Sequence, residues 1–170
     1  YPAKFLLAAA MNPCPCGYYR DLKVACICQK TQITKYWKKI SGPIIDRIDI
    51  VLEIPRLLRE DFSSKPETSN PYTSIKLRKR ILNAREKQLL RTKTTRTNSE
   101  LTPKEIKEFC QITSKPQKLL GKAIEKGWLT GRSYDKTLKV ARTIADLENS
   151  ESITLEHISE SLQYRLNISS

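Results

Sequence analysis

The sequence predicts an α/β segment followed by an all-helical bundle, and three features of its 170 residues support this fold class. Two apolar runs of strand length, at 4–10 and 49–54, lie in the first third of the chain. From residue 76 onward, apolar side chains recur every three or four positions, as they do in amphipathic helices. The chain between these parts is polar and contains several Ser and Pro residues, which is typical of a linker. We therefore expect three parts, at 1–56, 57–75 and 76–170.

The first part contains the elements of a small α/β unit. Residues 4–10 are apolar at almost every position, so we expect a central strand that is buried on both faces. A loop rich in Pro, Gly and Cys follows at 12–28, and residues 30–40 have the apolar spacing of a helix. Pro43 is suited to the first turn of a short helix, and 49–54 is a second strand. Because a parallel strand needs neighbours, we expect the sequence to be a fragment whose upstream part supplies the rest of the sheet.

The second part is expected to form a bundle of about five helices. Thr102, Pro103 and Glu105 make the pattern of a capping box with proline in the first turn, which begins one of them. Gly127 ends another helix, and Thr154 is suited to cap the last one. The expected helices lie at 76–91, 103–110, 116–126, 133–148 and 155–166.

The net charge of +13 favours polyanionic partners such as nucleic acid or nucleotides. Basic residues are densest at 76–96, where Glu86 is the one acidic side chain. A run of this kind is commonly a solvated helix face, and the alternative is a surface that binds nucleic acid. DNA is therefore a candidate partner. No apolar run approaches the ~20 residues of a membrane span, so we expect no membrane partner.

Four of the five cysteines form two close pairs, Cys14 with Cys16 and Cys26 with Cys28. Two such pairs can place four thiolates around a tetrahedral zinc ion in a structural site. Because metal-binding pairs more often have roughly two to four intervening residues, disulfides and reduced buried thiols remain alternatives. Cys110 has no obvious partner and no secretory signal is present, which indicates a reducing, cytoplasmic location.

Asn12 and Arg132 are two candidates for contact with a nucleotide. Asn12 follows the first expected strand, and ligands bind at the carboxyl ends of strands in open α/β sheets. The alternative for Asn12 is a turn cap before Pro13. Arg132 precedes the helix expected at 133–148, where it is either an exposed surface residue or a phosphate contact.

Arg47 is the third candidate, within a charged triplet between two apolar runs. It either pairs with Asp46 or Asp49, or projects toward a phosphate held by a neighbouring subunit, as arginine fingers do.

The sequence contains no G-x-x-x-x-G-K-[ST] loop, whose backbone amides would surround the phosphates of a nucleotide. No hydrophobic strand ends in paired acids suited to Mg²⁺. We therefore expect this chain alone to be inactive as an ATP hydrolase.

Three blocks of sequence occur in the order found in one family. They are AAMNPCPCGY at 9–18, ISGPIIDRID at 40–49 and VARTIADL at 140–147. With these blocks the chain resembles the magnesium-chelatase-like AAA+ ATPases of the ComM (YifB) group over nearly its whole length.

The resemblance implies the remnant of an AAA+ core, from the sensor-1 strand onward, followed by a helical lid. It implies that Asn12 is sensor 1, Arg47 the arginine finger and Arg132 the sensor-2 residue of the lid. Thr130-Gly131-Arg132 departs from the more usual Ser-x-Arg pattern. The implied cofactor is ATP with Mg²⁺, bound only when the missing Walker A and Walker B half is present. The implied assembly is a homo-oligomeric ring, a hexamer, that drives DNA branch migration in competence.

Two other functions remain open. One is a non-enzymatic DNA-binding module, stabilised by zinc, with 76–96 as its basic helix. The other is a motor subunit of a metal chelatase, which the cysteine loop disfavours.

Overall fold

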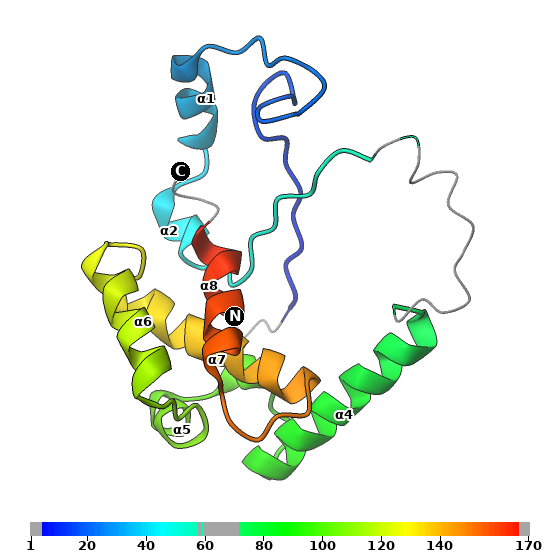
Figure 1. The fold of residues 1–170 in the computed structure, drawn as a ribbon, viewed down its shortest axis with the longest axis vertical. Coiled ribbons are helices and arrows are strands. Elements are labelled where there is room, and N and C mark those ends of the chain that lie inside the picture. Colours follow the sequence, from blue (N-terminus) through cyan, green and yellow to red (C-terminus); the bar gives the residue numbers. More distant parts are fainter. Residues whose placement is uncertain (1–4, 58, 60–71, 167–170) are drawn as a thin grey trace.

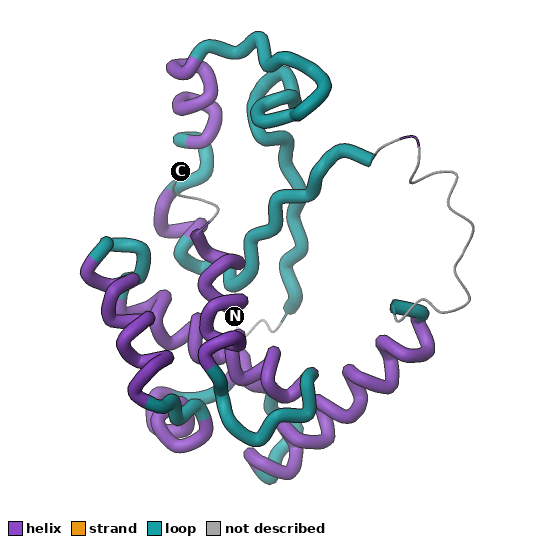
Figure 2. The backbone as a smooth tube through the Cα atoms, in the orientation of Figure 1, coloured by secondary structure: helices purple, strands orange, loops and turns teal. Residues whose placement is uncertain are grey.

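The computed structural model describes residues 5–57, 59 and 72–166, and the regular elements in these ranges are helices (Figures 1 and 2). They are α1 (Lys30–Trp37), α2 (Gly42–Ile45), α4 (Ser74–Thr92), the 3-10 helix η1 (Asn98–Glu100), α5 (Pro103–Phe109), α6 (Ser114–Glu125), α7 (Gly131–Leu147) and α8 (Leu155–Leu166). No described helix combines the length and the apolar character that a membrane crossing requires.

The predicted helices of the second part are confirmed, and capping explains where two of them begin. At α5, Thr102 Oγ1 accepts from the Glu105 amide (3.4 Å), while Glu105 Oε2 accepts from the Thr102 amide (2.8 Å). A similar reciprocal pair joins Thr130 and Ser133 at α7. Because Thr130 is the N-cap, α7 begins at Gly131, and Arg132 lies in its first turn rather than before the helix.

Helix α7 lies at the centre of the bundle and packs against α4, η1, α5 and α8. Its apolar residues join one core with residues of the surrounding helices and loops: Leu101, Ile106, Cys110, Leu120, Ala123, Leu129, Leu138, Ala141, Ala145, Ile153, Ile158 and Leu162. Ile112 and Ile153 form an isolated parallel bridge between the loops before α6 and α8. The bundle therefore forms a core without help from the first part of the chain.

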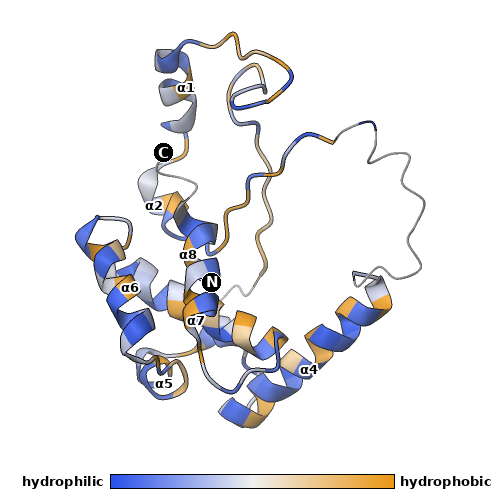
Figure 3. Ribbon diagram, viewed as in Figure 1, coloured by the Kyte–Doolittle hydropathy of each residue, from blue (hydrophilic) through white to orange (hydrophobic). Residues whose placement is uncertain are grey.

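The two strands expected in the first part do not form within the described residues, so the α/β prediction fails for this structure. Residue 4 lies outside them, and residues 5–10 and 49–54 form no strand ladder. Their apolar side chains are largely exposed, 94% for Leu6 and 82% for Ile54. Figure 3 shows the hydrophobic character of both segments along the ribbon. The physical reason is that a strand needs a neighbouring strand for its backbone groups, and neither segment lies beside one among the described residues.

Most of the linker expected at 57–75 lies outside the described residues. Its last residues are described, and Ser74 begins α4, two residues before the predicted start of that helix. Thr73 explains the shift, since its hydroxyl oxygen accepts from the Lys76 amide (3.5 Å) as an N-cap.

A buried ionic network fixes α7 to its surroundings. The carboxylate of Asp146, only 1% exposed, accepts hydrogen bonds from Arg91 of α4, from Asn98 Nδ2 of η1 (2.8 Å) and from Arg142 Nε of α7 (3.1 Å). Arg142 also donates to the carbonyls of Ser150 (2.7 Å) and Glu151 (2.8 Å) in the loop before α8. One carboxylate thus connects three elements, and Arg142 adds the connection to that loop.

The charge of Asp146 is maintained by these donors. Burial raises the pKa of this carboxyl, but the hydrogen bonds from Arg91 and Asn98 and the charge of Arg142 outweigh burial and lower it overall. Because the folded-state pKa is below the unfolded one, the stabilisation is complete above the usual Asp value near 4 and is lost as the pH falls below it.

We predict that Asp146→Asn destabilises the chain by about 3–5 kcal/mol, because it leaves two arginines facing a neutral amide in a buried site. Urea denaturation monitored by circular dichroism measures this change. Asp135→Asn, at a more exposed position of the same helix, is the matched control and should change the free energy of unfolding by less than about 0.5 kcal/mol. Equal unfolding midpoints for the two variants would contradict the structural role of Asp146.

Candidate functional site

The Cys14–Gly17 segment forms a tight turn that begins the cysteine loop. The Gly17 amide donates to the Cys14 carbonyl (3.0 Å), and Pro15 occupies the position where its fixed φ suits such a turn. Gly17 has a φ of 84°, a left-handed conformation that glycine adopts without strain. This turn explains how two cysteines separated by one residue present both thiols to the same point.

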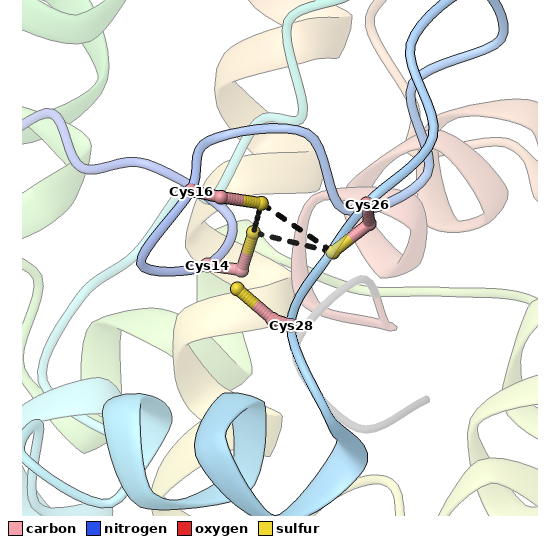
Figure 4. A group of neighbouring side chains, drawn as sticks. All are labelled: Cys14, Cys16, Cys26 and Cys28. Atoms are coloured by element: carbon pink, nitrogen blue, oxygen red, sulfur yellow. Dashed lines mark hydrogen bonds between the residues drawn. The ribbon is translucent and has the colours of Figure 1, made fainter.

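The second cysteine pair completes a cluster of four sulfur atoms (Figure 4). Cys14 Sγ lies 3.3 Å from Cys16 Sγ and 3.7 Å from Cys26 Sγ, and the Cys16 and Cys26 sulfurs are 3.6 Å apart. All four, including Cys28 Sγ, lie within 4.8 Å of one another. All are free thiols, since a disulfide requires an S–S distance of about 2.05 Å.

These distances fit tetrahedral coordination of a soft metal ion. Four sulfurs at ~2.3 Å from a central zinc ion are about 3.8 Å from one another. The three sulfur pairs among Cys14, Cys16 and Cys26, at 3.3–3.7 Å, are near that value. Four protein thiolates would fill the coordination sphere and leave no position for a substrate, so such a centre is suited to a structural role.

The electrostatics of Cys16 also suit metal binding. A hydrogen bond from the Tyr18 backbone amide is the main cause that lowers the pKa of the Cys16 thiol to about 6, so this thiol is the first of the cluster to ionise. Burial and the neighbouring thiols raise the pKa of Cys26 to about 12 and also raise that of Cys28. Cys110 contrasts with the cluster. It lies in the core of the bundle, where burial raises the pKa of its thiol to about 11, and it remains an ordinary buried side chain.

Two contacts hold the cysteine loop in place. The Trp37 indole Nε1–H, at the end of α1, donates to the Pro13 carbonyl (3.0 Å). Between the cysteine pairs, Asp21 Oδ1 accepts from the amides of Lys23 (2.8 Å) and Val24 (3.0 Å). Helix α1, which begins directly after Cys28 and Gln29, is therefore connected to the cluster at both of its ends.

Arg47 follows α2, and its side chain is exposed. Its guanidinium Nη1 donates to the Pro43 carbonyl (2.7 Å), and no carboxylate of the described residues lies within ion-pair distance. The pairing with Asp46 or Asp49 that the sequence left open is thus not formed. Asp49 pairs instead with Lys136 of α7 (2.8 Å).

Arg132 is exposed in the first turn of α7 and, among the described residues, no hydrogen bond or ion pair involves its side chain. Unpaired amides at the start of a helix favour anions, so both the guanidinium and the helix end suit a phosphate.

Asn12 is exposed next to the cysteine turn, where its side chain lies beside Gly17. The structure does not bring Asn12, Arg47 and Arg132 into one pocket. A shallow hollow on α8 contains none of them, since it is lined by Leu155, Glu156, Ser159, Glu160, Gln163 and Tyr164.

Sequence reasoning missed Lys136, whose Nζ donates to the Arg47 carbonyl (2.5 Å). The available signal was its position four residues after Arg132, which places both side chains on one face of α7.

Comparisons with known proteins identify the family of the chain. Residues 71–165 match the family described as "Magnesium chelatase, subunit ChlI C-terminal", and residues 1–62 match "Magnesium chelatase, subunit ChlI". The chain is 38% identical over 165 residues to the competence protein ComM of Haemophilus influenzae, and 39% identical over 166 residues to the uncharacterized protein YifB of Escherichia coli. An uncharacterized protein of Mycobacterium tuberculosis is 33% identical over 167 residues.

Each of these alignments covers 97% of this chain but only 31–32% of the relative. The chain thus spans about a third of the length of these relatives. The two family matches together include nearly every residue, and they include Asn12, Arg47, Arg132 and the four clustered cysteines. The chain belongs to the magnesium-chelatase-like ComM (YifB) family.

Proposed function

We propose that this chain is the nucleotide-sensing part of a ComM-like AAA+ ATPase that remodels DNA, with branch migration as its action. In this proposal Asn12 is sensor 1, Arg47 is the arginine finger and Arg132 is sensor 2. ATP with Mg²⁺ is the cofactor, and the working assembly is a homo-oligomeric ring, a hexamer, in the cytoplasm.

The observation that carries the proposal is that two arginines are exposed and form no ion pair among the described residues. Arg47 and Arg132 are exposed and have no acidic partner among the described residues. Lys136 connects the Arg47 backbone to α7, the helix whose first turn contains Arg132. A guanidinium keeps its charge at any physiological pH, so each of these two exposed groups favours a phosphate.

The exposed apolar segments support a further part of the proposal. Phe5, Leu6 and Leu7 are 67–94% exposed, and Leu52 and Ile54 are 61% and 82% exposed. Such side chains become buried when their segments join a sheet. In the proposal, that sheet and the phosphate-binding loop come from a Walker A and Walker B half, corresponding to sequence of the relatives that this chain does not match. This chain alone then does not hydrolyse ATP.

The test is a chimera in which this chain replaces the matching third of the Haemophilus influenzae relative. Arg47→Ala should lower the kcat of ATP hydrolysis about a thousandfold or more, because an arginine finger stabilises the transition state. Binding of a fluorescent ATP analogue should stay unchanged. Lys38→Ala removes another exposed cation near α2 and should keep the turnover of the parent chimera. Equal turnover of the Arg47→Ala variant and its parent would refute the finger assignment.

We also propose that the four-cysteine cluster holds a structural Zn²⁺ in the working protein. The support is the set of sulfur distances, which are close to those of a tetrahedral tetrathiolate site, and the lowered pKa of Cys16. The ion would join the Cys14–Cys16 turn to the residues that begin α1. This would stabilise a segment that has little core of its own, since Cys14 is its one fully buried side chain among those described in 5–57.

Metal analysis of the purified chain tests the zinc site. We expect about one zinc per chain, which a thiol-blocking mercurial releases in a single step. Cys26→Ser should lose the metal, while Cys110→Ser is the matched control, because Cys110 lies apart in the bundle core, and should retain it. Trp37 fluorescence should change on metal release, since its indole is bonded to the loop. A chain with no bound zinc that also takes up none from solution would refute the site.

Helix α4 favours a second function, a non-enzymatic DNA-binding module. This helix extends outward from the bundle (Figure 1). Only Ala84 and Gln88 of its 19 residues are buried. Its exposed basic side chains include Arg78, Lys79 and Arg80. A charged, projecting helix can follow a DNA backbone without any nucleotide bound to the protein.

Fluorescence anisotropy with a short DNA duplex tests this function on the chain itself. If α4 binds DNA, the logarithm of the affinity falls linearly with the logarithm of salt concentration, and changing Arg78, Lys79 and Arg80 to Ala reduces that slope by about 2–3. A variant with Lys107, Lys115 and Lys118 changed to Ala removes the same charge from exposed positions of α5 and α6. Equal slopes for the two triple variants would exclude α4 as the DNA-binding surface.

A further inference from the structure

The segment that carries Arg47 is bonded to the helical bundle through its backbone. Lys136 Nζ of α7 donates to the Arg47 carbonyl (2.5 Å) and pairs with Asp49 Oδ1 (2.8 Å). The Lys136 side chain is 25% exposed, so its stem is largely covered while its ammonium group reaches two acceptors of one segment.

Helix α8 supplies two more bonds to the same segment. The Val51 amide donates to the Tyr164 carbonyl (2.9 Å), and Arg165 Nη1 donates to the Ile48 carbonyl (3.4 Å). Residues 47–51 are thus held by the two helices that pack most closely in the bundle, α7 and α8. Lys136 is the member of this set that contacts Arg47 itself.

Lys136 lies four residues after Arg132 on α7. Residues with this spacing are neighbours on one helix face, separated by about 6 Å along the axis. The ammonium group of Lys136 therefore connects the Arg47 backbone to a point one turn from Arg132.

The bond from Lys136 leaves the guanidinium of Arg47 available to bind a phosphate. It is made to the main-chain carbonyl, while the guanidinium donates through Nη1 to the carbonyl of Pro43 in the preceding helix α2. A phosphate can replace that neutral acceptor without breaking the anchor, and the charge-assisted bonds that it forms are stronger.

We propose that Lys136 is a positioning residue that couples Arg47 to the helix carrying Arg132, so that both guanidinium groups move as one unit when a nucleotide phosphate binds. The proposal rests on the proposed function of Arg47 and Arg132. Lys136 itself touches no phosphate, and its effect on turnover passes through Arg47.

Hydrogen–deuterium exchange on the chain itself tests the anchor. Lys136→Gln removes the charge, and we expect amide exchange in residues 47–51 to accelerate about tenfold, as expected when one charge-assisted bond is lost. Lys136→Arg, which keeps a cationic donor, should restore most of the protection. Lys139→Gln is the matched control, because Lys139 of the same helix donates to the Ser99 carbonyl (2.9 Å), away from Arg47. Unchanged exchange at 47–51 in Lys136→Gln would overturn the proposal, and circular dichroism verifies that each variant is folded.

Turnover of the chimera described above tests the coupling. Lys136→Gln should lower kcat about tenfold with the KM for ATP unchanged, and Lys136→Arg should recover most of it. Adding Lys136→Gln to Arg47→Ala should lower kcat no further, because Lys136 acts through Arg47. If the decreases in kcat of the two single variants multiply in the double variant, the proposed coupling is overturned. If the parent chimera or Arg47→Ala contradicts the proposed function, the exchange experiment still decides whether the anchor exists.

Discussion

The carboxylate of Asp146 determines how the helical bundle is assembled. It is buried in the last turn of α7 and receives bonds from Arg91 of α4, from Asn98 of η1 and from Arg142 of its own helix. Burial of a charge is unfavourable unless donors surround it, so these elements must meet at this point in one arrangement. The apolar core around α7 supplies most of the burial, and the network fixes the orientation of the helix within it.

The orientation of α7 also determines the positions of the residues in its first two turns. Arg132 and Lys136 lie upstream of Asp146 on the same rigid helix, so an arrangement set at the buried end is transmitted to the exposed end. Residues 47–51 are joined to the bundle through that end and through α8. The position of Arg47 therefore depends on a carboxylate that it never contacts.

The helical bundle could be predicted from the sequence because its signals are local. The capping pattern at Thr102 and the spacing of apolar residues define helices that form within one segment. The cysteine cluster could also be anticipated, since both of its pairs lie within a short loop. The expected strands at 5–10 and 49–54 fail for the complementary reason: apolar sequence indicates burial, but a strand depends on partners that no local pattern supplies. The contact of Lys136 with Arg47 spans 89 positions and depends on how α7 is oriented, so spacing alone could not reveal it.

Some arginines of this chain form ion pairs and others do not, and this difference distinguishes structural arginines from candidates for a functional role. Arg91, Arg96 and Arg142 each form an ion pair with a carboxylate, so their charges stabilise the fold. Arg47, Arg78 and Arg132 are exposed and have no ion pair among the described residues.

Lack of an ion pair does not by itself identify a site, because Arg78 of α4 is solvated and its helix packs only near its other end. Arg47 and Arg132 differ from it in being attached to anchored backbone, one beside Lys136 and the other in the first turn of α7. Anchored backbone fixes the place from which each guanidinium can reach a phosphate, and correct placement is what a nucleotide-sensing residue needs. For this reason these two arginines, rather than the basic helix α4, support the assignment to nucleotide sensing.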